Sequence, residues 1–137
     1  MAKIKSYTDL QQSKKLAEIL PIETADMRYK EYTSSLDYSS KHCDVPSIGC
    51  PHSKDVPCWS LAALLGVMPQ INEWITPYGH KNDKLSQFEP KICKIWKHSF
   101  VPSYKVTYGN ELSTDVYDNP VDAFYDMIIR LHELNLL

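Results

Sequence analysis

The sequence predicts an α+β fold in which an antiparallel sheet carries helices mainly on one face, within a single domain over residues 1–137. Helical periodicity near both ends of the chain and a hairpin signal between them support this prediction. The 137 residues match one domain, which usually holds about 100–200 residues. The chain is 43% hydrophobic and 23% charged, as is typical of globular proteins, and this composition excludes collagen-like, low-complexity and membrane-embedded chains.

The first helix is predicted over residues 8–20, where apolar residues recur at helical spacing. Thr8 is the expected N-cap, and Gln11 three residues later would complete a capping box. Pro21 ends the helix, because the residue before a proline disfavours the helical conformation.

A Ser-, Pro- and Cys-rich stretch at about residues 33–57 predicts a long loop, which in a compact domain is often functional or locally stapled. Residues 58–67 predict a short buried helix, because the apolar residues of this segment would lie on all faces of the helix. Asp55 or the Val56-Pro57 pair would mark its start, and Pro69 follows its end.

Strands are predicted at Ile71–Tyr78, Lys91–Lys97 and Tyr104–Tyr108, the last with a clear alternation of apolar and polar residues. Gly109-Asn110 then indicates a two-residue turn, and the alternation continues in a return strand at residues 112–116.

The last helix is predicted from about Pro120 to Leu134, with Asp118 or Asn119 as its cap and Pro120 in its first turn. Its core-facing stripe consists of Val121, Phe124, Ile128 and Leu131.

The charge composition and the lack of a long apolar run limit the partners that the chain is expected to have. The chain has 15 basic and 17 acidic residues and a net charge of -2, so it shows no whole-chain preference for polyanions. Arg28 and Arg130 are its only arginines. This scarcity argues against functions in which several arginine side chains bind phosphate groups. The polar N-terminus and the lack of a long apolar run predict a cytoplasmic protein with no membrane partner.

A candidate zinc site comprises His42, Cys43, Cys50, His52 and Cys58, which fall close together in the sequence. Thiolate and imidazole are the ligands zinc prefers, and four suffice for a tetrahedral site. The spacing lacks a C-x-x-C pair, so the alternative is a loop whose cysteines and histidines share no ligand. No cofactor other than this candidate zinc is predicted.

Cys58 is also a candidate nucleophile, because a helix N-terminus lowers the pKa of a thiol. Its base would be His80, His98 or His132. The stretch "CWSLAA" resembles the helix of papain-like peptidases that carries their cysteine and tryptophan. The preceding residues and the short chain depart from that family, which leaves core packing of Cys58 and Trp59 as the alternative.

A basic stretch with interleaved aromatic residues is the third candidate site. Lys84, Lys91, Lys94 and Lys97 are candidates for contacting phosphates, and Trp96 for stacking on a base. The alternative is a solvated sheet face beside an acidic helix.

Asp118, Asp122 and Asp126 are four residues apart and predict a shared acidic face, which could hold a cation or serve as an acid/base pair. The alternative is a solvated face with acidic residues near the helix N-terminus.

Four stretches together resemble a family of small proteins of phages and prophages of gut bacteria, whose function is not established. They are "QQSKKLAEIL", "TADM", "PCWSLAALLGVMP" and "DNPVDAFYDMIIRLHELNLL". The resemblance implies a cytoplasmic, accessory or host-facing role, and it brings no catalytic residues.

The leading interpretation is therefore a non-enzymatic binding or adaptor protein that acts through protein–protein contacts. The alternatives are a zinc-stabilised domain that contacts nucleic acid and a small Cys/His hydrolase built on Cys58. The apolar tail with Leu134, Leu136 and Leu137 needs cover, so a homodimer is a further hypothesis.

Overall fold

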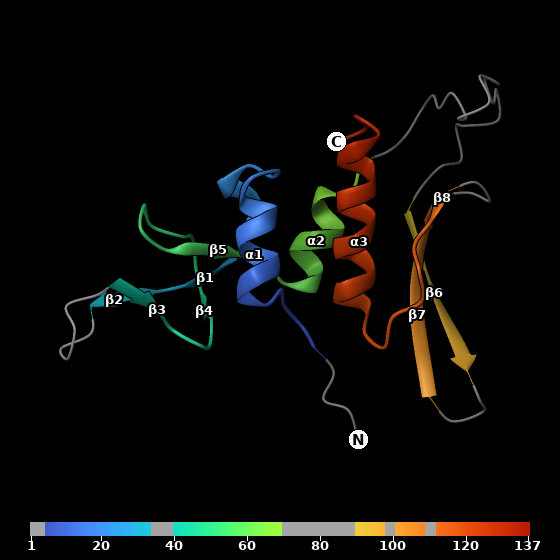
Figure 1. Cartoon of the computed structure of the whole chain (residues 1–137), viewed down its shortest axis with the longest axis horizontal. Helices are drawn as coiled ribbons and strands as arrows, with labels where there is room; N and C mark the ends of the chain where they lie inside the picture. Colours follow the sequence, from blue (N-terminus) through green and yellow to red (C-terminus); the bar gives the residue numbers. More distant parts are fainter. Residues whose placement is uncertain (1–4, 34–39, 70–89, 98–100, 109–111) are drawn as a thin grey trace. The chain divides into compact units, whose positions relative to one another are not determined.

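The computed structural model describes residues 5–33, 40–69, 90–97, 101–108 and 112–137 (Figure 1). Helices and antiparallel strand pairs make up this part of the chain, which confirms the α+β class. The described strands form three small sheets, where the sequence predicted one. The chain divides into two compact units, residues 1–67 and 68–137, and each is described by itself.

The described residues of the first unit form two α-helices, a short 3-10 helix and five strands (Figure 1). In chain order these are α1 (Leu10–Ala17), η1 (Ile22–Thr24), β1 (Met27–Tyr29), β2 (Glu31–Thr33), β3 (Ser40–His42), β4 (Ser47–Ile48), β5 (Val56–Cys58) and α2 (Leu61–Val67). One sheet has the order β4-β1-β5, and β2 pairs with β3 in a second sheet. In its described residues, the predicted loop at about 33–57 therefore holds the end of β2, the strands β3 and β4, and the beginning of β5.

The cap of α1 is Asp9, and the prediction of Thr8 with Gln11 is wrong by one residue. The Asp9 carboxylate accepts from the backbone N–H of Gln12 at 2.8 Å, and the Gln12 side chain accepts from the backbone N–H of Asp9 at 3.1 Å. This reciprocal pair satisfies two otherwise unpaired donors at the helix start. Thr8 does not cap the helix because its hydroxyl bonds to the buried Ser13 hydroxyl, at 2.7 Å.

The second helix, α2, begins later than predicted and is less buried. Cys58 belongs to β5, where it pairs with Met27 of β1, so the helix starts after it. The hydroxyl of Ser60 accepts from the backbone N–H of Ala63 at 3.2 Å and caps the new start. Within α2 only Leu64 is buried. The apolar composition of this segment therefore does not reflect burial on all sides.

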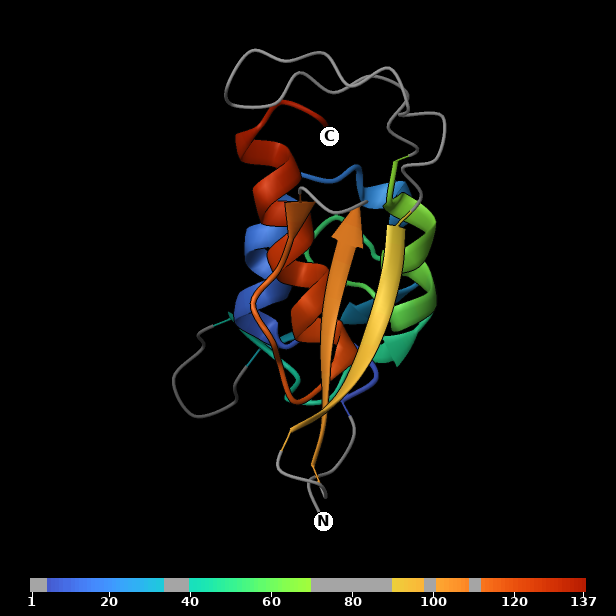
Figure 2. The ribbon, with the colours of Figure 1, turned by 90° about the vertical axis from the view of Figure 1, so that its right-hand side faces the viewer.

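The second unit contains β6 (Pro90–Lys97), β7 (Val101–Tyr108), β8 (Leu112–Ser113) and α3 (Pro120–Glu133). Its sheet has the order β6-β7-β8, and α3 runs along one face of it (Figures 1 and 2). The strands predicted at Lys91–Lys97 and Tyr104–Tyr108 are confirmed. The return strand predicted at residues 112–116 is shorter, because only Leu112–Ser113 form a strand, which pairs with Tyr108 and Thr107 of β7. The predicted strand at Ile71–Tyr78 and the Gly109-Asn110 turn lie outside the described residues.

The last helix follows its prediction closely. Asn119 caps α3 by accepting from the backbone N–H of Asp122, at 2.9 Å, and Pro120 occupies the first turn. The helix packs against β7. Its buried residues include the whole predicted stripe, Val121, Phe124, Ile128 and Leu131.

Replacing the cap of α1 tests this local assignment. Asp9→Ala removes the side-chain acceptor for the Gln12 N–H, so we expect the free energy of unfolding to fall by about 1 kcal/mol. Gln11→Ala is the matched control, because Gln11 is exposed and outside the capping box. Urea unfolding of both variants measures the difference. An equal loss in the two variants would contradict the assignment.

Candidate functional site

The five candidate zinc ligands do not form a common site. Within the described part of the chain, no three His, Cys, Asp or Glu side chains gather closely enough to hold a metal ion. The Nε2 atom of His42 instead lies 3.1 Å from the Lys54 carbonyl oxygen. Cys43 is half-buried, Cys50 and His52 are exposed, and Cys58 is enclosed in the core.

Asp55 organises the segment that carries these residues. Its carboxylate accepts backbone N–H groups from His52 at 3.0 Å and from Glu31 at 3.2 Å. The Arg28 guanidinium lies 3.7 Å from the same carboxylate and donates to the Cys50 carbonyl at 3.3 Å. The hydrogen bond from His52, more than any other interaction, holds the pKa of Asp55 below its usual range. Backbone hydrogen bonds and one ion pair thus hold this segment.

Cys58 lies in surroundings that oppose a nucleophilic role. Its side chain is 0% exposed, and burial raises the pKa of the thiol because the thiolate would lose its hydration. Its position in β5 also removes it from a helix N-terminus, the feature on which the prediction depended. Of the candidate bases, His80 and His98 lie outside the described residues, and His132 is exposed on α3 of the other unit.

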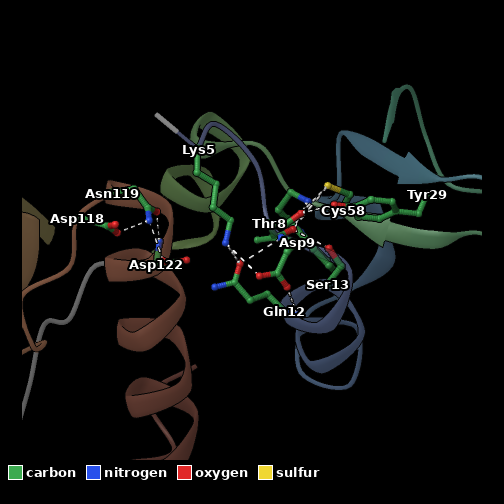
Figure 3. Close-up of polar contacts among 11 residues, drawn as sticks. Lys5, Thr8, Asp9, Gln12, Ser13, Tyr29, Cys58, Asp118, Asn119 and Asp122 are labelled. Carbon is green, nitrogen blue, oxygen red and sulfur yellow. Dashed lines mark hydrogen bonds and ion pairs between the residues drawn. The ribbon is translucent and has the colours of Figure 1, made fainter. Parts of the chain in front are cut away.

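The thiol takes part in a buried polar cluster around Thr8 (Figure 3). The Thr8 carbonyl accepts from the Tyr29 hydroxyl at 2.8 Å and from the Cys58 thiol at 3.4 Å. The Thr8 hydroxyl accepts from the Trp59 backbone N–H at 3.2 Å, and the Thr8 N–H donates to the Trp59 carbonyl at 3.0 Å. These bonds join the start of α1 to β1 and β5. The cluster therefore has a structural role, which the sequence pattern around Thr8 did not indicate.

The three aspartates of the predicted acidic face have separate partners. Asp118 and Asp122 each accept from the side-chain amide of Asn119, at 2.9 and 2.8 Å (Figure 3). Asp126 accepts from the Tyr117 hydroxyl at 2.9 Å and from Arg130 Nε at 2.9 Å. These bonds stabilise the start and one side of α3, which favours the structural alternative to a cation site.

A row of exposed side chains lies on β6, which we call the β6 stripe: Ile92, Lys94 and Trp96. Ile92 is 47% exposed and Trp96 is 60% exposed. Lys94 Nζ lies 4.8 Å from the centroid of the Trp96 ring, within the range of a cation–π contact. Residues two apart on a strand share one face, so the three side chains form a continuous surface.

The stripe contains two of the five residues predicted to contact nucleic acid. Lys94 and Trp96 are brought together, while Lys91 is exposed on the opposite face of the strand. Lys97 ends β6, and Lys84 lies outside the described residues. Ile92 was missed as a surface residue, because an aliphatic residue in a strand usually indicates the core.

No family model, curated protein or solved structure matches this chain. No helix among the described residues is long and apolar enough to cross a membrane.

Thiol labelling tests the burial of Cys58. In the folded protein we expect iodoacetamide to modify exposed Cys50 and to leave Cys58 unmodified, because burial restricts access and raises the pKa of that thiol. Unfolding in urea should equalise the two rates. Peptide mass spectrometry measures them, and comparable labelling of both cysteines in the native state would refute the assignment.

The pairing of Tyr117 with Asp126 predicts a pH dependence of stability. Burial, followed by the hydrogen bond to Asp126, raises the pKa of Tyr117 from 10.0 to about 12. A raised pKa means that the folded state favours the neutral phenol, so this stabilisation is complete below pH 10 and is lost between pH 10 and 12.

We expect Tyr117→Phe to show a shallower fall in the free energy of unfolding across this pH range. Tyr32→Phe, at an exposed position of β2, is the control and should keep the wild-type slope. Denaturant unfolding at several pH values measures both slopes, and identical slopes in the two variants would argue against the pairing.

Proposed function

We propose that this chain is a non-enzymatic binding or adaptor protein that contacts a partner protein through the β6 stripe. The observation that carries the proposal is the exposure of Trp96 beside Ile92 on one face of a strand. Tryptophan is enriched among the residues that dominate binding energy at protein interfaces. The chain's other described tryptophan, Trp59, is 0% exposed, so Trp96 is the exposed one of the two described tryptophans.

The contact between Lys94 and Trp96 favours binding. A cation–π contact restricts the indole ring before any partner arrives. Less side-chain entropy is then lost when the ring becomes buried, and preorganisation of this kind raises affinity. Ile92 extends the apolar surface along the same face.

The resemblance to phage and prophage proteins supports the biological setting of the proposal. A small adaptor of this type would act in the bacterial cytoplasm on a host or phage protein. We propose this setting on the sequence stretches that carry the resemblance.

Nucleic acid is the second candidate partner, because Lys94 and Trp96 together could contact a phosphate and stack on a base. The zinc-stabilised form of this hypothesis gains no support, since the candidate ligands are spread through the first unit. The hydrolase alternative loses support from the burial and raised pKa of Cys58.

A homodimer through the C-terminal tail remains a prediction. Leu134 is 42% exposed and Leu137 is 38% exposed, which offers apolar area to a second copy.

Site-specific photocrosslinking tests the proposed function. Benzoylphenylalanine at position 92 should crosslink a bacterial protein that, once purified, binds the wild-type chain. Trp96→Ala should weaken that binding by at least about 30-fold, the effect of losing an interface hot spot. Tyr32→Ala, which removes an exposed aromatic side chain from β2, should leave affinity unchanged.

Equal affinities of wild type and Trp96→Ala for the purified partner would overturn the proposal. Crosslinking to nucleic acid, with binding that weakens steeply as salt rises, would replace it with the second candidate.

A further inference from the structure

The outer edge of β6 is a second feature of the same strand. β6 pairs with β7 without interruption from Pro90↔Tyr108 to Lys97↔Val101, and β7 lies between β6 and β8. β6 is thus an edge strand of this sheet as the described residues define it. The outward N–H and C=O groups of an edge strand can pair with another extended chain.

The two strands of this hairpin are basic. β6 and β7 contain no acidic residue, and their described lysine side chains are Lys91, Lys94 and Lys105. No ion pair among the described residues involves any of these three lysines. The acidic Asp115 and Asp126 of this unit are instead paired with Arg130. The hairpin therefore has a positive charge that fits an acidic partner.

We infer that the partner contributes an acidic segment in extended conformation, which adds to the outer edge of β6 as a further strand. This inference rests on the proposed function and names the class of partner for the same strand. Main-chain hydrogen bonds to the edge would supply affinity, and alternate side chains would contact the β6 stripe and supply specificity.

A peptide fits this surface better than nucleic acid does. Ile92 and Trp96 stand on one face of the strand and offer apolar area to alternate side chains of an added strand. Nucleic acid would use the ring and the lysines but would leave most of the Ile92 surface without an apolar contact.

The first experiment selects ten-residue peptides from a random displayed library on the full chain. We expect enriched peptides to be acidic, with apolar residues at alternate positions. Trp96→Ala should bind a selected peptide at least about 30-fold more weakly. Lys94→Gln should bind about twofold to fivefold more weakly, and the exposed Lys14→Gln of α1 should bind as the wild type does.

Backbone methylation tests strand addition itself. Two versions of a selected peptide carry N-methyl groups at alternate residues. One version is methylated at the odd-numbered residues and the other at the even-numbered residues. Successive N–H groups of a strand point in opposite directions, so one version should lose binding and the other should retain it. Equal effects of the two versions would overturn strand addition. If Trp96→Ala still weakens binding of the purified partner protein in that case, the proposed function stands without the inference.

Other outcomes also decide the question. Failure to enrich acidic peptides would overturn the inference. The lysines would then serve to prevent other chains from pairing with this edge strand. A dimer in native mass spectrometry that Trp96→Ala dissociates would assign the strand to a second copy. Binding of fluorescein-labelled oligo-dT, lost in Trp96→Ala, with no peptide enriched would assign it to nucleic acid.

Discussion

The packing of α3 against β7 decides which side chains of the second unit are buried and which are exposed. An α-helix is about 10–12 Å wide with its side chains, and neighbouring strands are about 4.8 Å apart, so one helix covers about two strands. Val106 of β7 is 0% exposed, whereas its cross-strand partner Ile92 of β6 is half exposed. The two side chains share a sheet face, since directly paired residues point to the same side. The stripe on β6 thus follows from the width of one helix.

In the first unit, the polar residue Thr8 fixes how the segments pack together. The backbone and hydroxyl of Thr8 bond to Tyr29, Cys58 and Trp59, which come from β1, β5 and the residue after β5. Buried polar groups are costly unless they are paired, so these bonds select one arrangement of the segments over others of similar apolar burial. The same cluster places the Cys58 thiol in the core beside the Thr8 carbonyl, and burial there raises the pKa of the thiol.

The proposed binding surface on β6 is separate from the polar groups that hold the fold together. The groups that looked reactive in the sequence, Cys58 and the aspartates near α3, have structural partners. The exposed Lys94 and Trp96 of β6 contact each other, and no ion pair among the described residues involves Lys94.

The sequence by itself determined the elements with strong local signals. Asn119 and Pro120 define the start of α3, and the alternation at Tyr104–Tyr108 defines β7, because capping and period-2 patterning act between near neighbours. Only the tertiary structure decided that Cys58 belongs to a strand, that Asp9 caps α1 in place of Thr8, and that Ile92 is exposed. Each of these outcomes depends on contacts between distant residues, such as Cys58 with Met27 and Thr8 with Trp59, and local patterns do not contain them.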